Sequence, residues 1–216
     1  MKFKHFIITR FNYGIYDRDD ADEWMEHRLR LFEEYTLPSI RNQTNQGFTW
    51  VLCFDERTPG KIICKYDYID NVEIFYGRGK DWIKQKPAEA DFILTSRIDN
   101  DDFYHPDFVQ RIHMEWLGRG MKEMLIDIQY YIMDRETKEL WDLERGVPNS
   151  PLITLCEWWQ GAEGVLAHEH SNMTDYYKGY IIPEYLACQV AHDKNVICHC
   201  RGKKKDHKLW SLNSTD

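Results

Sequence analysis

Residues 92–103 read F-I-L-T-S-R-I-D-N-D-D-F and join an apolar run to a short polar segment. Ile93, Leu94 and Ile98 give the run the apolar content of a strand that lies inside a sheet. The segment Asp99–Asp102 follows at the point where this strand ends. Open α/β sheets bind their ligands in the crevice outside the carboxyl ends of their strands. The stretch therefore predicts a buried strand that brings carboxylates to a ligand-binding crevice.

These carboxylates predict a binding site for a metal cation. Oxygen ligands suit hard cations such as Mg²⁺ or Mn²⁺, which use one or two protein carboxylates and leave other positions for water and substrate phosphates. We therefore expect Mn²⁺ or Mg²⁺ and a phosphate-bearing substrate. The alternative is that the same acids only cap the next helix, because Asp favours helix N-caps and Pro106 suits a first helical turn. The pattern alone leaves both interpretations open.

Strand-like runs alternate with helical periodicity along the chain. An amphipathic helix is predicted from Glu23 to Asn42, and Pro38 should kink or divide it. The alternation predicts an α/β fold with a doubly wound, mainly parallel sheet and helices on both faces. The other predicted elements are strands at 6–8, 48–54, 72–76 and 92–98, a helix at 107–117, a strand at 124–133 in a hairpin with 140–143, loops and short strands at 146–172, and a helix at 182–191.

Length and composition indicate one ordinary globular domain. The chain has 216 residues, of which 43% are hydrophobic and 30% charged, and this length allows one sizeable core. No apolar run is long enough to span a bilayer, and the amino terminus lacks the pattern of a signal peptide. We therefore expect a cytoplasmic protein without a transmembrane segment, and its six cysteines should be reduced thiols.

The charge distribution bears on the partner. A net charge of −8 argues against a surface that coats nucleic acid, because such surfaces are basic. Residues 201–208 read R-G-K-K-K-D-H-K and form a local basic cluster that could meet phosphates. The tight spacing of Cys198, His199 and Cys200 does not match a zinc finger.

The motifs resemble a known family. A strand ending in F-D-E and another ending in D-N-D-D resemble the amino-terminal half of GT-A fold glycosyltransferases, with residues 99–101 standing as their D-x-D motif. The chain also resembles the rhamnosyltransferase family of bacteria and phages. The blocks that carry this second resemblance are H-F-I-I-T-R-F-N (5–12), T-L-P-S-I-R-N-Q (36–43), F-T-W-V-L-C-F-D-E-R-T-P (48–59), S-R-I-D-N-D-D (96–102) and Q-V-A-H-D-K-N (189–195). No G-x-G-x-x-G fingerprint or P-loop accompanies them, which counts against dehydrogenases and kinases.

The resemblance implies a single Rossmann-like domain, with a nucleotide-binding half at 1–117 and an acceptor half with the C-terminal tail at 118–216. It implies that Asp55 binds the nucleotide base, that Arg10 and Arg97 lie near ribose or phosphate, and that Asp99 and Asp101 contact ribose and metal. Sheet topology would bring Thr9 and Asn12 into the same crevice. The implied third metal ligand is a distant histidine, with His192 as first choice and His199 as second. The cation would neutralise the charge of the departing diphosphate.

An inverting transferase also needs a base that takes the proton of the acceptor hydroxyl. Three carboxylates are candidates: Glu163, Glu184 and Asp102. Acceptor contacts are expected from aromatic and imidazole side chains: Trp158, Trp159 and His170.

The sequence therefore predicts a metal-dependent glycosyltransferase that moves a sugar from a nucleoside-diphosphate sugar to a hydroxyl acceptor. That acceptor is either a surface glycan or a hydroxylated base in phage-type DNA. Two alternatives stay open: a non-catalytic module that binds nucleotides or anions, and a metal-dependent phosphohydrolase. Oligomeric state does not follow from the sequence.

Overall fold

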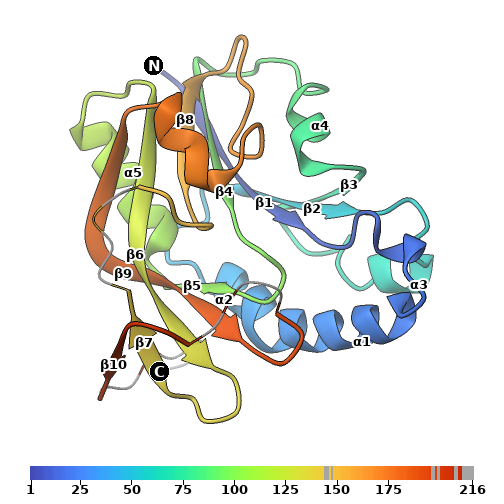
Figure 1. The fold of residues 1–216 in the computed structure, drawn as a ribbon. Coiled ribbons are helices and arrows are strands. Elements are labelled where there is room, and N and C mark those ends of the chain that lie inside the picture. The colour runs from blue at the N-terminus through green and yellow to red at the C-terminus, as the bar shows by residue number, and fades with distance from the viewer. Residues whose placement is uncertain (144–145, 147, 196–197, 199, 207–208, 211–216) are drawn as a thin grey trace.

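The computed structural model describes all residues except 144–145, 147, 196–197, 199, 207–208 and 211–216. Figure 1 shows one strongly curved sheet with helices packed around it. The strands follow the order β10-β7-β6-β8-β4-β1-β2-β3, and β9 joins β5 to β6. Their bounds are β1 (Phe3–Arg10), β2 (Thr49–Phe54), β3 (Val72–Tyr76), β4 (Phe92–Arg97), β5 (Phe103–Tyr104), β6 (Met124–Asp134), β7 (Leu140–Asp142), β8 (Thr154–Trp158), β9 (Gly179–Ala191) and β10 (Lys203–Lys205).

The strands of the first half run parallel. β1 lies between β2 and β4, with Arg10 opposite Cys53 in β2 and Ile8 opposite Arg97 in β4. β3 adds to the outer side of β2. Because parallel strands end at the same edge, the segments that follow β1, β2 and β4 meet at one edge of the sheet. The predicted α/β class is confirmed.

Antiparallel pairs dominate the second half. β8 runs antiparallel to both β4 and β6, and β7 forms the predicted hairpin with β6. Only the pair of β6 and β9 is parallel among the described strands of this half. The sheet is therefore mixed rather than mainly parallel, which corrects the prediction. The physical reason is that β8 runs in the direction opposite to β4 and β6, its two neighbours. Antiparallel neighbours need no helical crossover between them.

The helix predicted at 182–191 is wrong, because these residues belong to β9 (Figure 1). Leu186, Ala187 and Gln189 favour a helix locally, but pairing with β6 along the whole strand satisfies the backbone instead. A register shift carries Pro183 past β6, since Ile128 faces Ile182 and Gln129 faces Tyr185. Proline is tolerated in strands at such irregularities. Tertiary pairing thus overrides local propensity.

The long helix predicted before the second strand is divided, as expected from Pro38. It consists of α1 (Ala21–Leu31), a π-helical turn (Phe32–Thr36) and α2 (Leu37–Arg41). Proline has no N–H and its ring clashes with the carbonyl four residues earlier, so the preceding turn widens. The remaining α-helices are α3 (Gly60–Ile63), α4 (Gly79–Ile83) and α5 (Phe108–Gly118).

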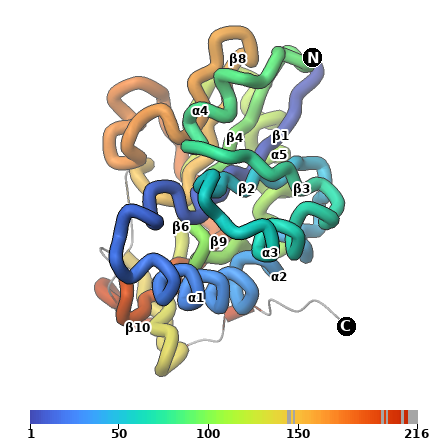
Figure 2. Tube along the Cα trace, turned by 90° about the vertical axis from the view of Figure 1, so that its right-hand side faces the viewer, coloured from blue at the N-terminus to red at the C-terminus, as the bar shows by residue number. Residues whose placement is uncertain are grey.

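Helices cover both faces of the parallel half, as predicted. Alternate residues of β1 point to opposite sides, so Ile7 belongs to the buried cluster that also contains Phe32 of the π-helical turn and Trp116 of α5. Ile8 packs with Trp82 of α4 on the other side. Figure 2 shows α1 and α4 on opposite sides of β2 and β3. None of the described helices has the length and apolar content that crossing a bilayer requires.

Candidate functional site

A cavity of about 1140 Å³ opens at the edge where β1 and β4 end. Its lining is rich in charge, with basic side chains outnumbering acidic ones among the described residues. The basic side chains are Arg10, Arg28, Arg78, Lys80, Arg97 and Arg201. The acidic side chains are Asp99, Asp101, Asp102 and Glu169. Such a lining suits an anion together with a cation.

Asp99 is held between two arginines. Its carboxylate lies 3.5 Å from Nη2 of Arg10 and 3.4 Å from Nη2 of Arg97. Burial raises the pKa of this carboxyl, but the positive charges of Arg97, Arg10 and Arg28 outweigh burial and lower the pKa overall. Asp99 is therefore ionised at neutral pH and faces the cavity.

Asp101 accepts all its described contacts through one oxygen. Oδ2 pairs with Nη1 of Arg28 and lies 3.0 Å from Nε2 of His192 and 3.4 Å from Nδ2 of Asn195. The backbone N–H of Lys194 donates to Nδ1 of His192 over 3.2 Å, so that nitrogen carries no proton. With Nδ1 as the acceptor, we assign the proton of the neutral ring to Nε2, which donates it to Asp101 and also lies 3.0 Å from Nδ2 of Asn195.

Two buried guanidinium groups in this lining have unused donors. Nε of Arg28 and Nε of Arg97 are buried without a hydrogen-bond partner. The side chains are only 12% and 6% exposed, respectively. An unpaired donor on a buried charged group is costly, and a bound anion would relieve that cost. The cavity thus offers guanidinium groups placed for a phosphate.

Asp102 faces the same lining but is tied into the fold. Its carboxylate accepts hydrogen bonds from the backbone N–H of Val190 at 3.1 Å and from Nε2 of Gln189 at 3.3 Å. Burial raises the pKa of this carboxyl well above its ordinary value, and the negative charges of Asp101 and Asp99 add to the rise. A buried carboxylate whose two oxygens already accept hydrogen bonds from β9 is poorly placed to act as a base.

The residues expected to bind the nucleotide divide into two groups. Arg10, Asn12, Arg97 and Asp99 line the cavity. The hydroxyl of Thr9 is buried beneath the cavity and accepts a hydrogen bond from Nε1 of Trp50 at 3.0 Å.

Asp55 lies behind the loop that follows β1. Its carboxylate accepts hydrogen bonds from the backbone N–H of Gly14 at 2.9 Å and from the Arg57 guanidinium. The Arg57 side chain holds the pKa of Asp55 well below its ordinary value. Asn12 accepts the backbone N–H of Asp55 at 2.9 Å, so the loops after β1 and β2 are joined. Gly14 adopts a positive φ of 77°, which glycine allows and which turns its N–H toward Asp55.

The opposite wall of the cavity is the segment 166–171. Val165 donates its backbone N–H to Oγ1 of Thr95 at 2.9 Å, which fixes one end of this wall to β4. His170, predicted as an acceptor contact, lies in the wall, and its Nδ1 is 2.8 Å from the backbone oxygen of Asn149. Glu169 precedes the short 3-10 helix His170–Asp175 and is exposed to the cavity.

Glu163 lies beside this wall and not in the lining. Oε2 of Glu163 is 3.3 Å from Nε2 of His168, which does line the cavity. The backbone N–H groups of Glu163 and Gly164 donate to the buried carboxylate of Glu157. This clamp holds the start of the wall in place.

The structure places three of the expected residues away from the cavity. Glu184 pairs with Arg111 at 2.7 Å on the surface. Trp158 stacks on Phe92 at the start of β4, and Trp159 is buried against Phe6. Because β8 runs antiparallel to β4, the end of β8 lies beside the beginning of β4, which is the edge opposite Asp99.

Three residues that sequence reasoning missed belong to this site. Arg28 lies on α1, and its helix gave no sign of the distant contact with Asp101. Lys80 comes from the start of α4. Glu169 stands between two histidines, and a carboxylate at the start of a helical turn in a loop rich in Gly and His is the signal that could have identified it.

Comparison with solved structures shows that the arrangement of the strands is that of a GT-A type fold. Residues 1–349 of Staphylococcus aureus TarS in complex with UDP are 16% identical to the chain. The match covers 88% of this chain and 61% of that one, with a TM-score of 0.52. The complex of the same protein with UDP-GlcNAc gives 16% identity, coverage of 90% and 60%, and a TM-score of 0.53.

The sequence match is local. Residues 18–68 match the family described as "Putative rhamnosyl transferase", which confirms the resemblance seen in the sequence blocks. A comparison with curated protein sequences gives no match. The chain spans about 60% of the length of the TarS structures.

Proposed function

We propose that the protein transfers a sugar from a nucleoside-diphosphate sugar to a hydroxyl acceptor. The observation that carries this proposal is the pair of buried arginines, Arg28 and Arg97, whose Nε atoms have no partner beside Asp99 and Asp101. A diphosphate supplies acceptors for both guanidinium groups, and the complexes of TarS with UDP and UDP-GlcNAc support a uridine nucleotide as the donor.

The acids of the cavity fit a divalent cation. Asp99 is ionised, and Asp101 keeps Oδ1 without a described partner, so each can offer a hard oxygen ligand to Mg²⁺ or Mn²⁺. When bound, such a cation would neutralise charge on the leaving diphosphate. We assign His192 the role of holding Asp101 in position through Nε2. Arg10, Arg28 and Arg97 would bind and orient the phosphates.

We assign the role of base to Glu169. It is an exposed carboxylate in the wall that faces the D-x-D segment, whereas Asp102 is buried and its carboxylate is hydrogen-bonded to Val190 and Gln189. From that wall, Glu169 would take the proton of the acceptor hydroxyl as the oxygen attacks the anomeric carbon from the face opposite the diphosphate. This geometry gives inversion. His168 and His170 flank Glu169 and would contact a glycan acceptor.

The first experiment is calorimetric titration of UDP, GDP and dTDP into the purified protein, with and without Mn²⁺. We expect UDP to bind most tightly, and we expect Mn²⁺ to strengthen binding in the wild type but not in Asp101→Asn. Product analysis with UDP-sugars then separates the alternatives. A glycosylated acceptor with UDP indicates a transferase, sugar phosphate with UMP indicates a phosphohydrolase, and binding without turnover indicates a non-catalytic module. Silence across the nucleotide panel would overturn the proposal.

A further inference from the structure

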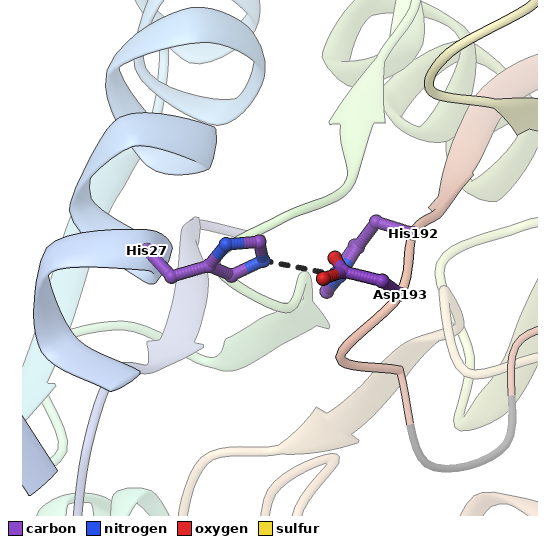
Figure 3. A group of neighbouring side chains, drawn as sticks. All are labelled: His27, His192 and Asp193. Atoms are coloured by element: carbon purple, nitrogen blue, oxygen red, sulfur yellow. Dashed lines mark hydrogen bonds and ion pairs between the residues drawn. The ribbon is translucent and has the colours of Figure 1, made fainter. Parts of the chain in front are cut away.

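A second group of metal-ligating side chains lies behind the cavity. Figure 3 shows His27 on α1 pointing toward His192 and Asp193, which follow β9. Within the part of the chain that the structure describes, this is the group of three whose ligand atoms all lie within 4.8 Å of one another. His27 is 6% exposed, the His192 side chain 1% and the Asp193 side chain 72%.

The distances match one small cation. Nε2 of His27 lies 3.2 Å from Nδ1 of His192, and Oδ1 of Asp193 lies 3.9 Å from the same nitrogen. Two nitrogens bound to one tetrahedral Zn²⁺ at their usual bond lengths are about 3.3 Å apart. The two imidazoles are therefore already at the spacing of neighbouring ligands. Asp193 is exposed, so its carboxylate is free of the packing that fixes the two imidazoles and would move toward them to complete the site.

The surroundings prepare His192 for this role. Nδ1 of His192 is the acceptor nitrogen of the ring, since the N–H of Lys194 donates to it at 3.2 Å, and Nε2 of His27 lies at the same distance from it. The proton is then on Nε2, which donates it to Asp101 at 3.0 Å. A carboxylate that accepts the second N–H of a ligating histidine is the usual outer partner at protein metal sites. A cation would take the Nδ1 lone pair in place of the contacts from His27 and the Lys194 N–H.

We propose that His27, His192 and Asp193 form a site for a borderline divalent cation such as Zn²⁺, separate from the D-x-D site. Imidazole and carboxylate ligands suit Zn²⁺, Co²⁺ and Ni²⁺ better than Mg²⁺. The site uses Nδ1 of His192, whereas Nε2 contacts Asp101 of the D-x-D segment, so the two sites lie on opposite sides of one ring. The cation joins α1 to the turn after β9 and fixes the ring that holds Asp101.

The test is a titration of Co²⁺, followed by visible absorption, and of Zn²⁺, followed by calorimetry, without nucleotide. The proposal expects one equivalent to bind, with affinity reduced at least tenfold in His27→Gln and in Asp193→Asn. His105→Gln, which changes another partly buried histidine outside the cluster, and Asp99→Asn should bind as the wild type does. Because Asp193 is exposed, its variant reports on binding even if His27→Gln does not fold.

A thermal readout gives an independent check. Zn²⁺ should raise the melting temperature of the wild type and not that of Asp193→Asn, because a ligand stabilises only the state that binds it. Three outcomes overturn the proposal: no binding, equal binding in Asp193→Asn, or loss of binding in Asp99→Asn. A cobalt–thiolate absorption band would also overturn it, because it would place the ion on a cysteine such as the exposed Cys64.

Discussion

Oδ1 of Asp102 accepts a hydrogen bond of 3.1 Å from the backbone N–H of Val190. The backbone oxygen of Asp102 accepts a second one from the hydroxyl of Thr36 at 2.7 Å. One residue therefore fastens the D-x-D segment both to β9 and to the turn before α2. Asp102 therefore stabilises the structure around the proposed donor site.

This relationship predicts how Asp102 responds to substitution. Asp102→Ala should lower the free energy of unfolding by about 1–3 kcal/mol, because the N–H of Val190 loses its buried partner. Asp102→Asn keeps an acceptor oxygen and should cost less. Urea denaturation measures both. Normal stability of Asp102→Asn together with a loss of kcat above about 100-fold would instead make Asp102 the base.

Arg28 and Arg30 offer a matched pair on α1. Arg28 lies in the cavity beside Asp101, whereas the Arg30 side chain is 63% exposed and faces Glu26. Arg28→Lys should weaken UDP binding at least about tenfold, because an ammonium group lacks the planar fork that binds a phosphate through two donors. Arg30→Lys should leave the Kd unchanged. Equal affinities of both variants in calorimetry would remove Arg28 from the donor site.

Glu169 and Glu163 lie near each other in sequence but differ in position. Glu169→Gln should reduce kcat by about 100-fold to 10,000-fold and leave the KM for the donor nearly unchanged, because only proton transfer is lost. Glu163→Gln loses the contact with His168 and should have a smaller effect. Steady-state kinetics on both variants checks the assignment. The reverse order of effects would make Glu163 the base.

The buried histidine pair predicts acid sensitivity. Burial lowers the pKa of His113 from its ordinary value of 6.5 to about 4. Its Nε2 lies 3.0 Å from Nδ1 of His5, whose pKa burial and the neighbouring His113 also lower. The unfolded chain thus binds more protons below pH 6.5, so stability is present above that pH and is lost as the pH falls toward 4. For His113 alone this loss is on the order of 3 kcal/mol.

Unfolding titrations across this range provide the measurement. His113→Gln should flatten the decline in the free energy of unfolding between about pH 6.5 and 4 relative to the wild type. The comparison concerns slopes, because the substitution also changes the contact with Asn45. Parallel slopes for the two proteins would mean that His113 is protonated in the folded state as well.

The parallel half could be predicted because its signals are local. The apolar runs around Ile7, Val51 and Leu94 became β1, β2 and β4. The polar segments after β1 and β4 line one cavity, whereas Asp55 after β2 lies behind the loop that follows β1. Pro38 marked the division of the long helix correctly. In these segments, the spacing of apolar residues and the position of proline predict the same elements that the packed structure contains.

The second half could not be predicted because its elements depend on distant partners. Leu186, Ala187 and Gln189 favour a helix locally, but pairing of the whole of β9 with β6 makes this segment a strand. Trp158 lies away from the cavity because β8 runs antiparallel to β4. A parallel β8 would place Trp158 at the edge of the sheet where the cavity lies. The contact of Arg28 with Asp101 joins segments far apart in sequence and leaves no local trace. Hydrophobic periodicity therefore does not predict which side chains reach the cavity when their positions depend on strand direction and on pairing with distant segments.

The two fastenings of the cavity wall also bear on how the protein can be altered. Glu157 and Thr95 grip its beginning, and the contact of His170 with Asn149 holds its far side, all outside the arginine and D-x-D wall. Residues 166–168 lie between these anchors and line the cavity. We therefore expect substitutions there to change this wall while Arg10, Arg97 and Asp99 keep their own contacts. Residues 166–168, next to the proposed base Glu169, are therefore where we expect loop engineering to change the acceptor preference.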